Sequence, residues 1–139
     1  MVAFTQSSTQ VEKQLTSVKR VRRVIIIDHE PTYSLFLSKV IAGLGHEVIE
    51  ITDPLAADFS ALKVTDLVLL DIMLPRGGGT EALKAIARLG SNCSVALMCG
   101  AGDHPNDAVE YAEQLRLRVT GVLKKPFRHV DLETILEET

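Results

Sequence analysis

Charged residues follow three apolar stretches of this sequence, and their types could support chemistry. Asp28, His29 and Glu30 come directly after the β-branched run VIII, and Asp71 ends the stretch DLVLLD. The run VTGVL is followed by two lysines, of which Lys125 directly precedes a proline. Two carboxylates and an ammonium group are the side chains that a phosphoryl-transfer site needs, provided that the fold brings them together.

The chemistry expected of such a site follows from its charges. Carboxylates that are crowded together repel one another and require a cation between them. Few oxygen ligands from the protein suit Mg²⁺, which keeps several of its waters. A carboxylate that faces this ion and a lysine can attack a phosphoryl group, because both cations neutralise the transferring oxygens. The carboxylates at two of the strand ends are therefore candidates to hold such an ion and to act as the nucleophile, and a lysine at the third strand end is a candidate electrostatic partner.

The elements that must position these residues follow from the periodicity of apolar residues. Five short apolar runs have the length of strands, and they span residues 24–28, 47–51, 66–71, 94–99 and 119–126. A helix is expected after each strand; the five helices begin at Pro31 and Pro54 and cover residues 80–90, 106–116 and 129–138. The glycine-rich segment 75–79 is expected to be a loop. Residues 1–20 are polar and poorly periodic, and we expect a flexible extension there, before one domain over residues 21–139.

The alternation of strands and helices predicts an α/β fold. Strands that are apolar throughout are typical of a parallel sheet that is buried on both faces. Right-handed crossovers then place helices on both sides, in a doubly wound three-layer sandwich. Ligands of such sheets bind beyond the carboxyl ends of the strands, so Asp28, Asp71 and Lys125 are expected at one edge.

Composition limits the class of protein. The chain has 139 residues, of which 46% are hydrophobic, enough for one domain with a core. A net charge of −3 gives no general attraction to nucleic acid or anionic lipid, and no apolar run approaches the roughly 20 residues of a membrane span. Cys93 and Cys99 are expected at opposite ends of one strand, about 20 Å apart and too far for a disulfide. We therefore expect a reduced, cytoplasmic protein without nucleic-acid or membrane partners.

Other α/β classes lack their defining residues. A dinucleotide enzyme needs G-x-G-x-x-G at the first helix, where this chain has the acidic turn DHEPT. A phosphohydrolase with an Asp-x-Asp pair needs a general acid two residues after its nucleophile, where this chain has Met73. A cysteine hydrolase needs a base beside its nucleophile, and no base can be assigned to Cys99.

The motifs at the strand ends resemble the receiver domain of two-component response regulators. The resemblance rests on VIIIDHEP, on DLVLLDIMLPRGGG with Pro75 and Gly79 after Asp71, and on VLKKPF with Lys125, Pro126 and Phe127. It covers residues 22–138 and implies the flavodoxin-like form of the fold, with a Lys125–Pro126 bond that is cis. It also implies a signalling domain rather than an enzyme, with Asp71 as phosphoacceptor for a histidine kinase or phosphotransfer protein. The implied metal ligands are Asp28, Asp71 and the backbone carbonyl of Met73, and Lys125 is the implied lysine of the site.

The resemblance also implies a partner surface. An effector domain or a second copy of the chain would bind the face made by the fourth helix, the fifth strand and the fifth helix.

Five positions depart from the receiver pattern. His29 stands where receivers have a second acid. Imidazole is a poor ligand of Mg²⁺ and suits softer transition metals better, although a solvent-facing histidine is the simpler interpretation. Cys99 replaces the Ser or Thr whose hydroxyl contacts the phosphoryl group, and a thiol is a weak donor. Val122 replaces an aromatic residue that moves together with that hydroxyl. Met73 and Ala101 stand where other receivers orient the hydrolytic water, which predicts slow self-dephosphorylation.

Two interpretations follow from these residues. Asp71 and Lys125 favour a receiver that is phosphorylated with Mg²⁺ or Mn²⁺. His29, Cys99 and Val122 favour a degenerate receiver, which keeps the fold and binds other proteins without phosphorylation.

Overall fold

The computed structural model describes residues 21–54, 57–89 and 92–138. The five strands are β1 (Arg23–Ile27), β2 (Glu47–Ile51), β3 (Leu67–Asp71), β4 (Ser94–Cys99) and β5 (Arg118–Lys124). The α-helices are α2 (Pro31–Gly43), α3 (Gly78–Leu89), α4 (Asn106–Gln114) and α5 (His129–Glu138). All strand pairs are parallel and the order is β2-β1-β3-β4-β5. The predicted doubly wound, flavodoxin-like sandwich is therefore confirmed.

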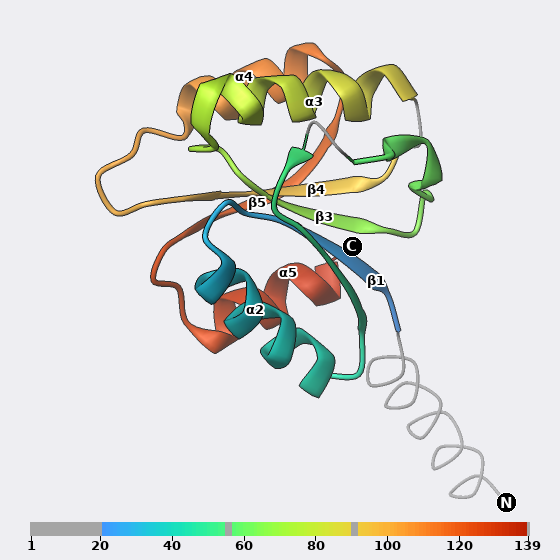
Figure 1. Ribbon diagram of the computed structural model, residues 1–139, viewed down its shortest axis with the longest axis vertical. Coiled ribbons are helices and arrows are strands. Elements are labelled where there is room, and N and C mark those ends of the chain that lie inside the picture. Colours follow the sequence, from blue (N-terminus) through green and yellow to red (C-terminus); the bar gives the residue numbers. More distant parts are fainter. Residues whose placement is uncertain (1–20, 55–56, 90–91, 139) are drawn as a thin grey trace, which may run out of the picture.

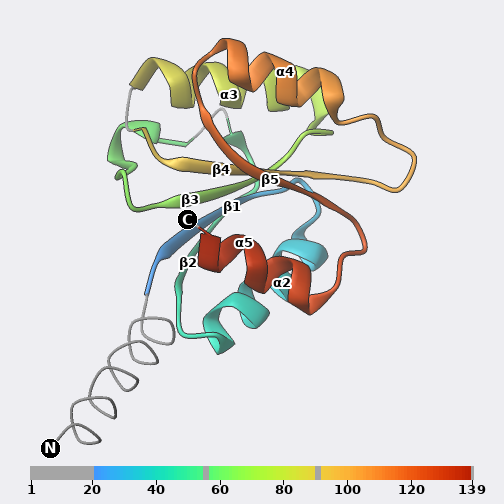
Figure 2. The same cartoon turned by 180° about the vertical axis from the view of Figure 1, so that it is seen from behind.

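The helices form one layer on each face of the sheet (Figures 1 and 2). Helices α2 and α5 cover one face, and α3 and α4 cover the other. Side chains alternate between these faces along each strand, so Ile26 of β1 packs toward α2 while Ile27 packs toward α3. The strands β1, β3 and β4 carry apolar side chains on both faces of the sheet, and helices cover both faces. The edge strands β2 and β5 are only partly buried.

The expected helix after β2 is not present in the described residues. Between β2 and β3, the described residues include the short 3₁₀ helix η2 (Phe59–Ala61), and Pro54 also has 3₁₀ geometry. The Asp58 side chain accepts a hydrogen bond from the Ser60 backbone N–H at 3.0 Å. This bond caps η2, and Leu62 directly after it is extended, so the helical turn stops after three residues and the cap-like Thr52-Asp53-Pro54 was misleading. Within the described residues, four α-helices cover the sheet rather than the five expected.

The glycine-rich segment after β3 differs from the predicted loop. Residues Pro75–Gly77 form the 3₁₀ helix η3, and α3 already begins at Gly78, two residues before the predicted start. A β-carbon on Gly79 would stand 2.8 Å from the carbonyl oxygen of Ile72. The first turn of α3 therefore lies against the backbone after Asp71, and glycine permits that approach.

Two further expectations can be placed. The Lys125–Pro126 peptide bond is cis, as the resemblance implied. The predicted extension over residues 1–20 lies outside the described residues.

Candidate functional site

Three strands deliver charged side chains to the carboxyl edge of the sheet. Asp28 follows β1 directly, Asp71 is the last residue of β3, and Lys125 follows β5. Neighbouring β1 and β3 pair Ile27 with Leu70, so the two aspartates leave adjacent strands side by side. Both aspartates are buried, at 0% and 2% exposure. Buried carboxylates need a compensating charge, and the fold provides it from a residue far along the sequence.

Lys125 joins the two carboxylates. Its Nζ lies 2.7 Å from Oδ2 of Asp28 and 3.3 Å from Oδ2 of Asp71. Burial alone would lower the pKa of Lys125, but the hydrogen bond to Asp28 and the charges of both aspartates outweigh burial and raise it above 10.5. The ammonium group is therefore fully charged at neutral pH. The preceding Lys124 is exposed.

The position of Lys125 is defined by contacts on two sides. Its backbone N–H donates a hydrogen bond to the Cys99 carbonyl at 2.7 Å, which ties the end of β5 to the end of β4. Its Nζ lies 4.5 Å from the centre of the Tyr33 ring, within the range of a cation–π contact. Tyr33 in turn packs edge-on against Phe127 with ring centres 6.0 Å apart.

Tyr33 is the residue of this site that sequence reasoning missed. Its helical spacing with Leu37 and Ile41 indicated only a core position on α2. That spacing is correct, but Tyr33 lies in the first turn of α2, so its ring is close to the carboxyl edge of the sheet and to Nζ of Lys125. The available signal was an aromatic residue five positions after Asp28, the first acid.

Backbone amides hold the remaining oxygens of the two carboxylates. The N–H of Glu30 donates to Oδ1 of Asp28 at 2.9 Å, and the N–H of Met73 donates to Oδ1 of Asp71 at 2.9 Å. Each aspartate thus begins a tight turn at the end of its strand. The side chains of Glu30 and Met73 are exposed, so Glu30 supplies an amide, rather than a second carboxylate, to this turn.

His29 lies at the open side of the acidic pair. Its Nδ1 is 3.3 Å from Oδ2 of Asp71 and 3.9 Å from Oδ1 of Asp28. The side chain is 38% exposed, so it is both in contact with solvent and directed at the site. One ligand atom from each of Asp28, His29 and Asp71 lies within 4.8 Å of the others. Two carboxylates and an imidazole at this spacing form a donor set that fits a divalent cation.

Cys99 is buried at the end of β4, with 0% exposure. Burial raises the pKa of its thiol, and the nearby charge of Asp103 raises it further. Asp103 also accepts a hydrogen bond from the Gly100 backbone N–H at 2.5 Å, closing the turn after β4. The thiol is therefore uncharged at neutral pH, and it packs as a small apolar group.

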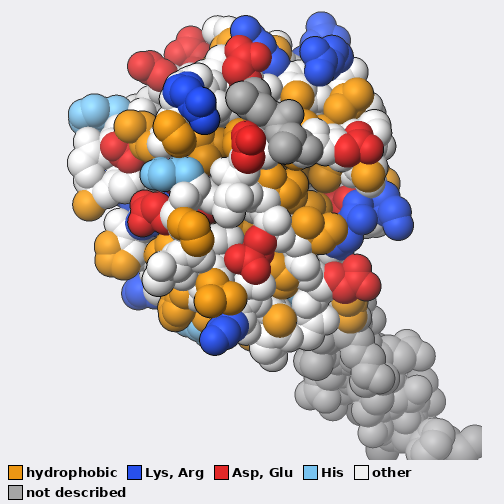
Figure 3. Space-filling view, in the orientation of Figure 1, with side chains coloured by type: hydrophobic (Ala, Val, Ile, Leu, Met, Phe, Trp, Pro, Cys, Tyr) orange, Lys and Arg blue, Asp and Glu red, His pale blue; other side chains and the backbone are white. Residues whose placement is uncertain are grey.

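The predicted partner face is open at β5. Val122 is 36% exposed on this edge strand, and Val130 of α5 is 51% exposed. On the face in Figure 3, acidic and basic side chains are interspersed, without a broad region of one charge. Within the described ranges, no helix is long and apolar enough to span a bilayer.

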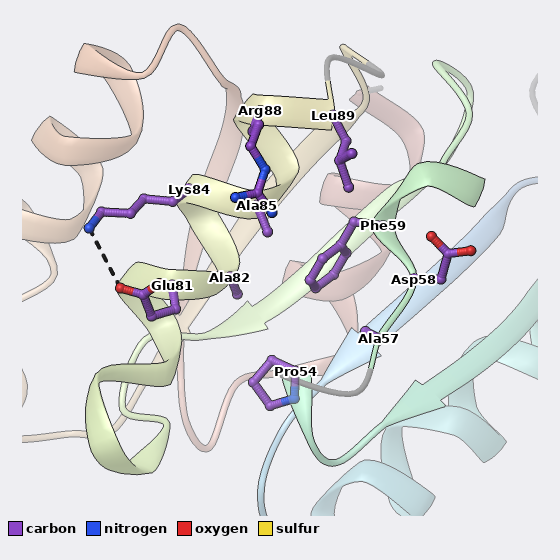
Figure 4. Close-up of a pocket in the computed structure, with 10 residues that line it drawn as sticks. All are labelled: Pro54, Ala57, Asp58, Phe59, Glu81, Ala82, Lys84, Ala85, Arg88 and Leu89. Carbon is purple, nitrogen blue, oxygen red and sulfur yellow. Dashed lines mark ion pairs between the residues drawn. The ribbon is translucent and has the colours of Figure 1, made fainter.

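A separate hollow of about 270 Å³ lies between α3 and the β2–β3 connection (Figure 4). Apolar side chains such as Phe59 and Leu89 line it, and an exposed ion pair between Glu81 and Lys84, 3.5 Å apart, stands at its side. It contains none of the residues at the carboxyl edge, so it is distinct from the charged site.

Comparison with known proteins gives consistent matches. The family described as the response regulator receiver domain matches residues 24–137. Transcription factor SKN7 of Candida albicans is 29% identical over 134 residues, which are 94% of this chain but only 23% of that protein. A response regulator from Colwellia psychrerythraea has a TM-score of 0.73 and 26% identity, over 84% of this chain and 94% of that one. A receiver domain protein from Clostridium thermocellum, at 21% identity and a TM-score of 0.71 over 84% of this chain and 92% of that one, shows the same fold.

Proposed function

The chain belongs to the response regulator receiver domain family of two-component signalling, and we propose that it accepts a phosphoryl group on Asp71. The donor would be a phosphohistidine of a histidine kinase or phosphotransfer protein. The observation that carries this proposal is the position of Lys125, whose Nζ lies within 3.3 Å of both Asp28 and Asp71.

The transfer itself requires little of the protein beyond position and charge. An oxygen of Asp71 attacks phosphorus, a P–O bond forms, and the P–N bond to the donor imidazole breaks; the donor nitrogen keeps the electron pair. Lys125 would move its contact from Asp71 to an oxygen of the arriving phosphoryl group, while Asp28 keeps the ammonium in place. The backbone N–H of Met73 holds the second oxygen of Asp71, which directs the first toward the donor.

A bound divalent cation would supply positive charge opposite the transferring oxygens. Asp28 and Asp71 would hold it, with the backbone carbonyl of Met73 and the imidazole of His29 as further ligands. We propose Mg²⁺ or Mn²⁺ as this ion.

Intact mass after incubation with acetyl phosphate tests the proposal, because this donor needs no kinase. We expect one added phosphoryl group that depends on a divalent cation and is absent after chelation. Asp71→Asn removes the nucleophile and should abolish the adduct, whereas Asp107→Asn, an exposed aspartate in the first turn of α4, should leave it unchanged. No adduct with any cation would contradict the proposal.

The same experiment, followed over time after removal of the donor, measures how long the adduct lasts. We propose slow self-dephosphorylation, because Met73 has no hydrogen-bonding side-chain group for water and Ala101 has none either. The adduct should then persist for many minutes. Loss within seconds would contradict this prediction.

A phosphorylation-independent interaction module is the second candidate function. The buried Cys99 favours it, since an uncharged thiol replaces the expected hydroxyl beside the site. In either case we propose that an effector domain or a second copy binds the face of α4, β5 and α5. A reducing, cytoplasmic setting is part of the proposal, because a buried thiol in the site is typical of such compartments.

A further inference from the structure

We propose that His29 changes the metal preference of this site, from Mg²⁺ toward softer first-row transition ions such as Zn²⁺. The inference deepens the proposed function, on which it rests for the location of the cation. It concerns which ion binds, and it can be tested without any phosphoryl donor.

The geometry places the imidazole among the ligands. Two donor atoms bound to one ion at about 2.1 Å are about 3.0–3.5 Å apart. The Nδ1 of His29 is already 3.3 Å from Oδ2 of Asp71 and 3.9 Å from Oδ1 of Asp28, so the first distance has the spacing of two ligands and the second is slightly longer. His29 lies in the loop between β1 and α2, and 38% of its side chain is exposed.

The charges of the site also favour transition ions over Mg²⁺. Lys125 contacts Oδ2 of both aspartates, so one of the two negative charges is already compensated before a cation arrives. A hard ion such as Mg²⁺ gives up its waters reluctantly and depends on carboxylate charge. An imidazole ligand adds no negative charge for Mg²⁺, but it is a favourable ligand for Zn²⁺. The substitution of an acid by His29 therefore weakens Mg²⁺ binding more than that of transition ions.

Direct binding measurements on the metal-free chain test the proposal. Most sites bind Zn²⁺ more tightly than Mg²⁺, so the informative quantity is how the ratio of the two dissociation constants changes on substitution. We expect His29→Asp to tighten Mg²⁺ and weaken Zn²⁺, changing the ratio by at least about tenfold, which corresponds to about 1.4 kcal/mol. His29→Asn is the second variant, and it should weaken Zn²⁺ without tightening Mg²⁺.

A matched control uses the other histidine that lies beside an acid. His129 on α5 is exposed, with Nδ1 3.0 Å from Glu133, and could bind a transition ion independently. His129→Gln should leave the ratio unchanged. Added Mn²⁺ should also broaden the ring resonances of His29 before those of the other histidines, in a nuclear magnetic resonance titration.

An unchanged ratio in both His29 variants would overturn the proposal, as would broadening at His129 first. These results are distinguishable from failure of the proposed function. A shifted ratio without any phosphoryl adduct would contradict phosphorylation alone, whereas an adduct formed equally well with Mg²⁺ and an unchanged ratio would contradict the role of His29 alone.

Discussion

At the scale of single residues, Tyr33 connects the packed core to the charged site. Tyr33 belongs to the first turn of α2, and its side chain is partly buried. The centre of its ring lies 4.5 Å from Nζ of Lys125. Phe127 meets the same ring edge-on and limits its rotation. The Tyr33 ring therefore contacts Lys125 and also Phe127, two residues later in the same segment. This contact restricts the lysine, which otherwise has four rotatable bonds.

The environment of Tyr33 predicts a pH dependence. Burial, followed by the charges of Asp28, Glu30 and Asp71, raises the pKa of Tyr33 to about 12 from its usual 10.0. Between these values the folded chain holds a proton that the unfolded chain has lost, so stability contributed by this group falls as pH rises from 10 toward 12. Compared with Tyr33→Phe, the wild type should therefore lose stability more steeply across this range.

Ultraviolet absorbance of phenolate, followed during a base titration, measures the same pKa directly. Tyr33→Phe should remove the step near pH 12, and Tyr111→Phe is the control that should retain it. If every tyrosine of the folded chain ionised near pH 10, the buried contact described for Tyr33 would be wrong.

At the scale of elements, the start of α3 determines where the turn after Asp71 lies. A methyl group on Gly79 would meet the Ile72 carbonyl at 2.8 Å, and backbone cannot move as readily as a flexible side chain. We expect Gly79→Ala to lower the free energy of unfolding by about 1–3 kcal/mol, as overpacking does elsewhere. Urea unfolding at equilibrium measures this difference.

Gly43 at the end of α2 provides the matched control. A β-carbon there has no atom within 4 Å, so Gly43→Ala should be neutral or slightly stabilising. Equal losses of unfolding free energy in both variants would show that the close approach between α3 and the turn does not contribute to stability. Because the turn at Ile72 follows Asp71 directly, Gly79→Ala should also reduce the yield of phosphoryl adduct.

At the scale of the whole molecule, two residues that would link the proposed phosphoacceptor site to the proposed partner face are replaced in this chain. Cys99 cannot donate a strong hydrogen bond to a phosphoryl group, and Val122 has no large ring to move on β5. A change in conformation requires contacts that differ between two states, and both of these contacts are missing. The phosphorylated and unphosphorylated chains should therefore have similar structures at α4 and β5.

Hydrogen exchange with and without phosphorylation tests this prediction. We expect the backbone amides of α4 and β5 to exchange at nearly the same rates in both forms of the wild type. The combined variant Cys99→Thr and Val122→Tyr restores a donor and a ring, and it should show a larger difference between the two forms. A large change in the wild type would reveal a relay through other residues.

Much of the architecture follows from local sequence. The runs at 47–51 and 94–99 have the bounds of β2 and β4, because continuous apolar residues are read directly from the chain. Pro31 and the segment 129–138 likewise mark α2 and α5. The missing helix after β2 could not be foreseen in this way, because Pro54 gives the same helix-start signal as Pro31, whether or not a helix follows.

The candidate site was likewise predictable from the sequence only in part. Sequence alone was enough to predict that Asp28, Asp71 and Lys125 stand at one edge, since residues that follow parallel strands must meet there. Only the tertiary structure determined that Lys125 bridges both carboxylates, that Tyr33 faces it, and that His29 is directed at the acidic pair. Those contacts depend on the order of strands and on distances between segments up to 97 residues apart, which no local pattern encodes.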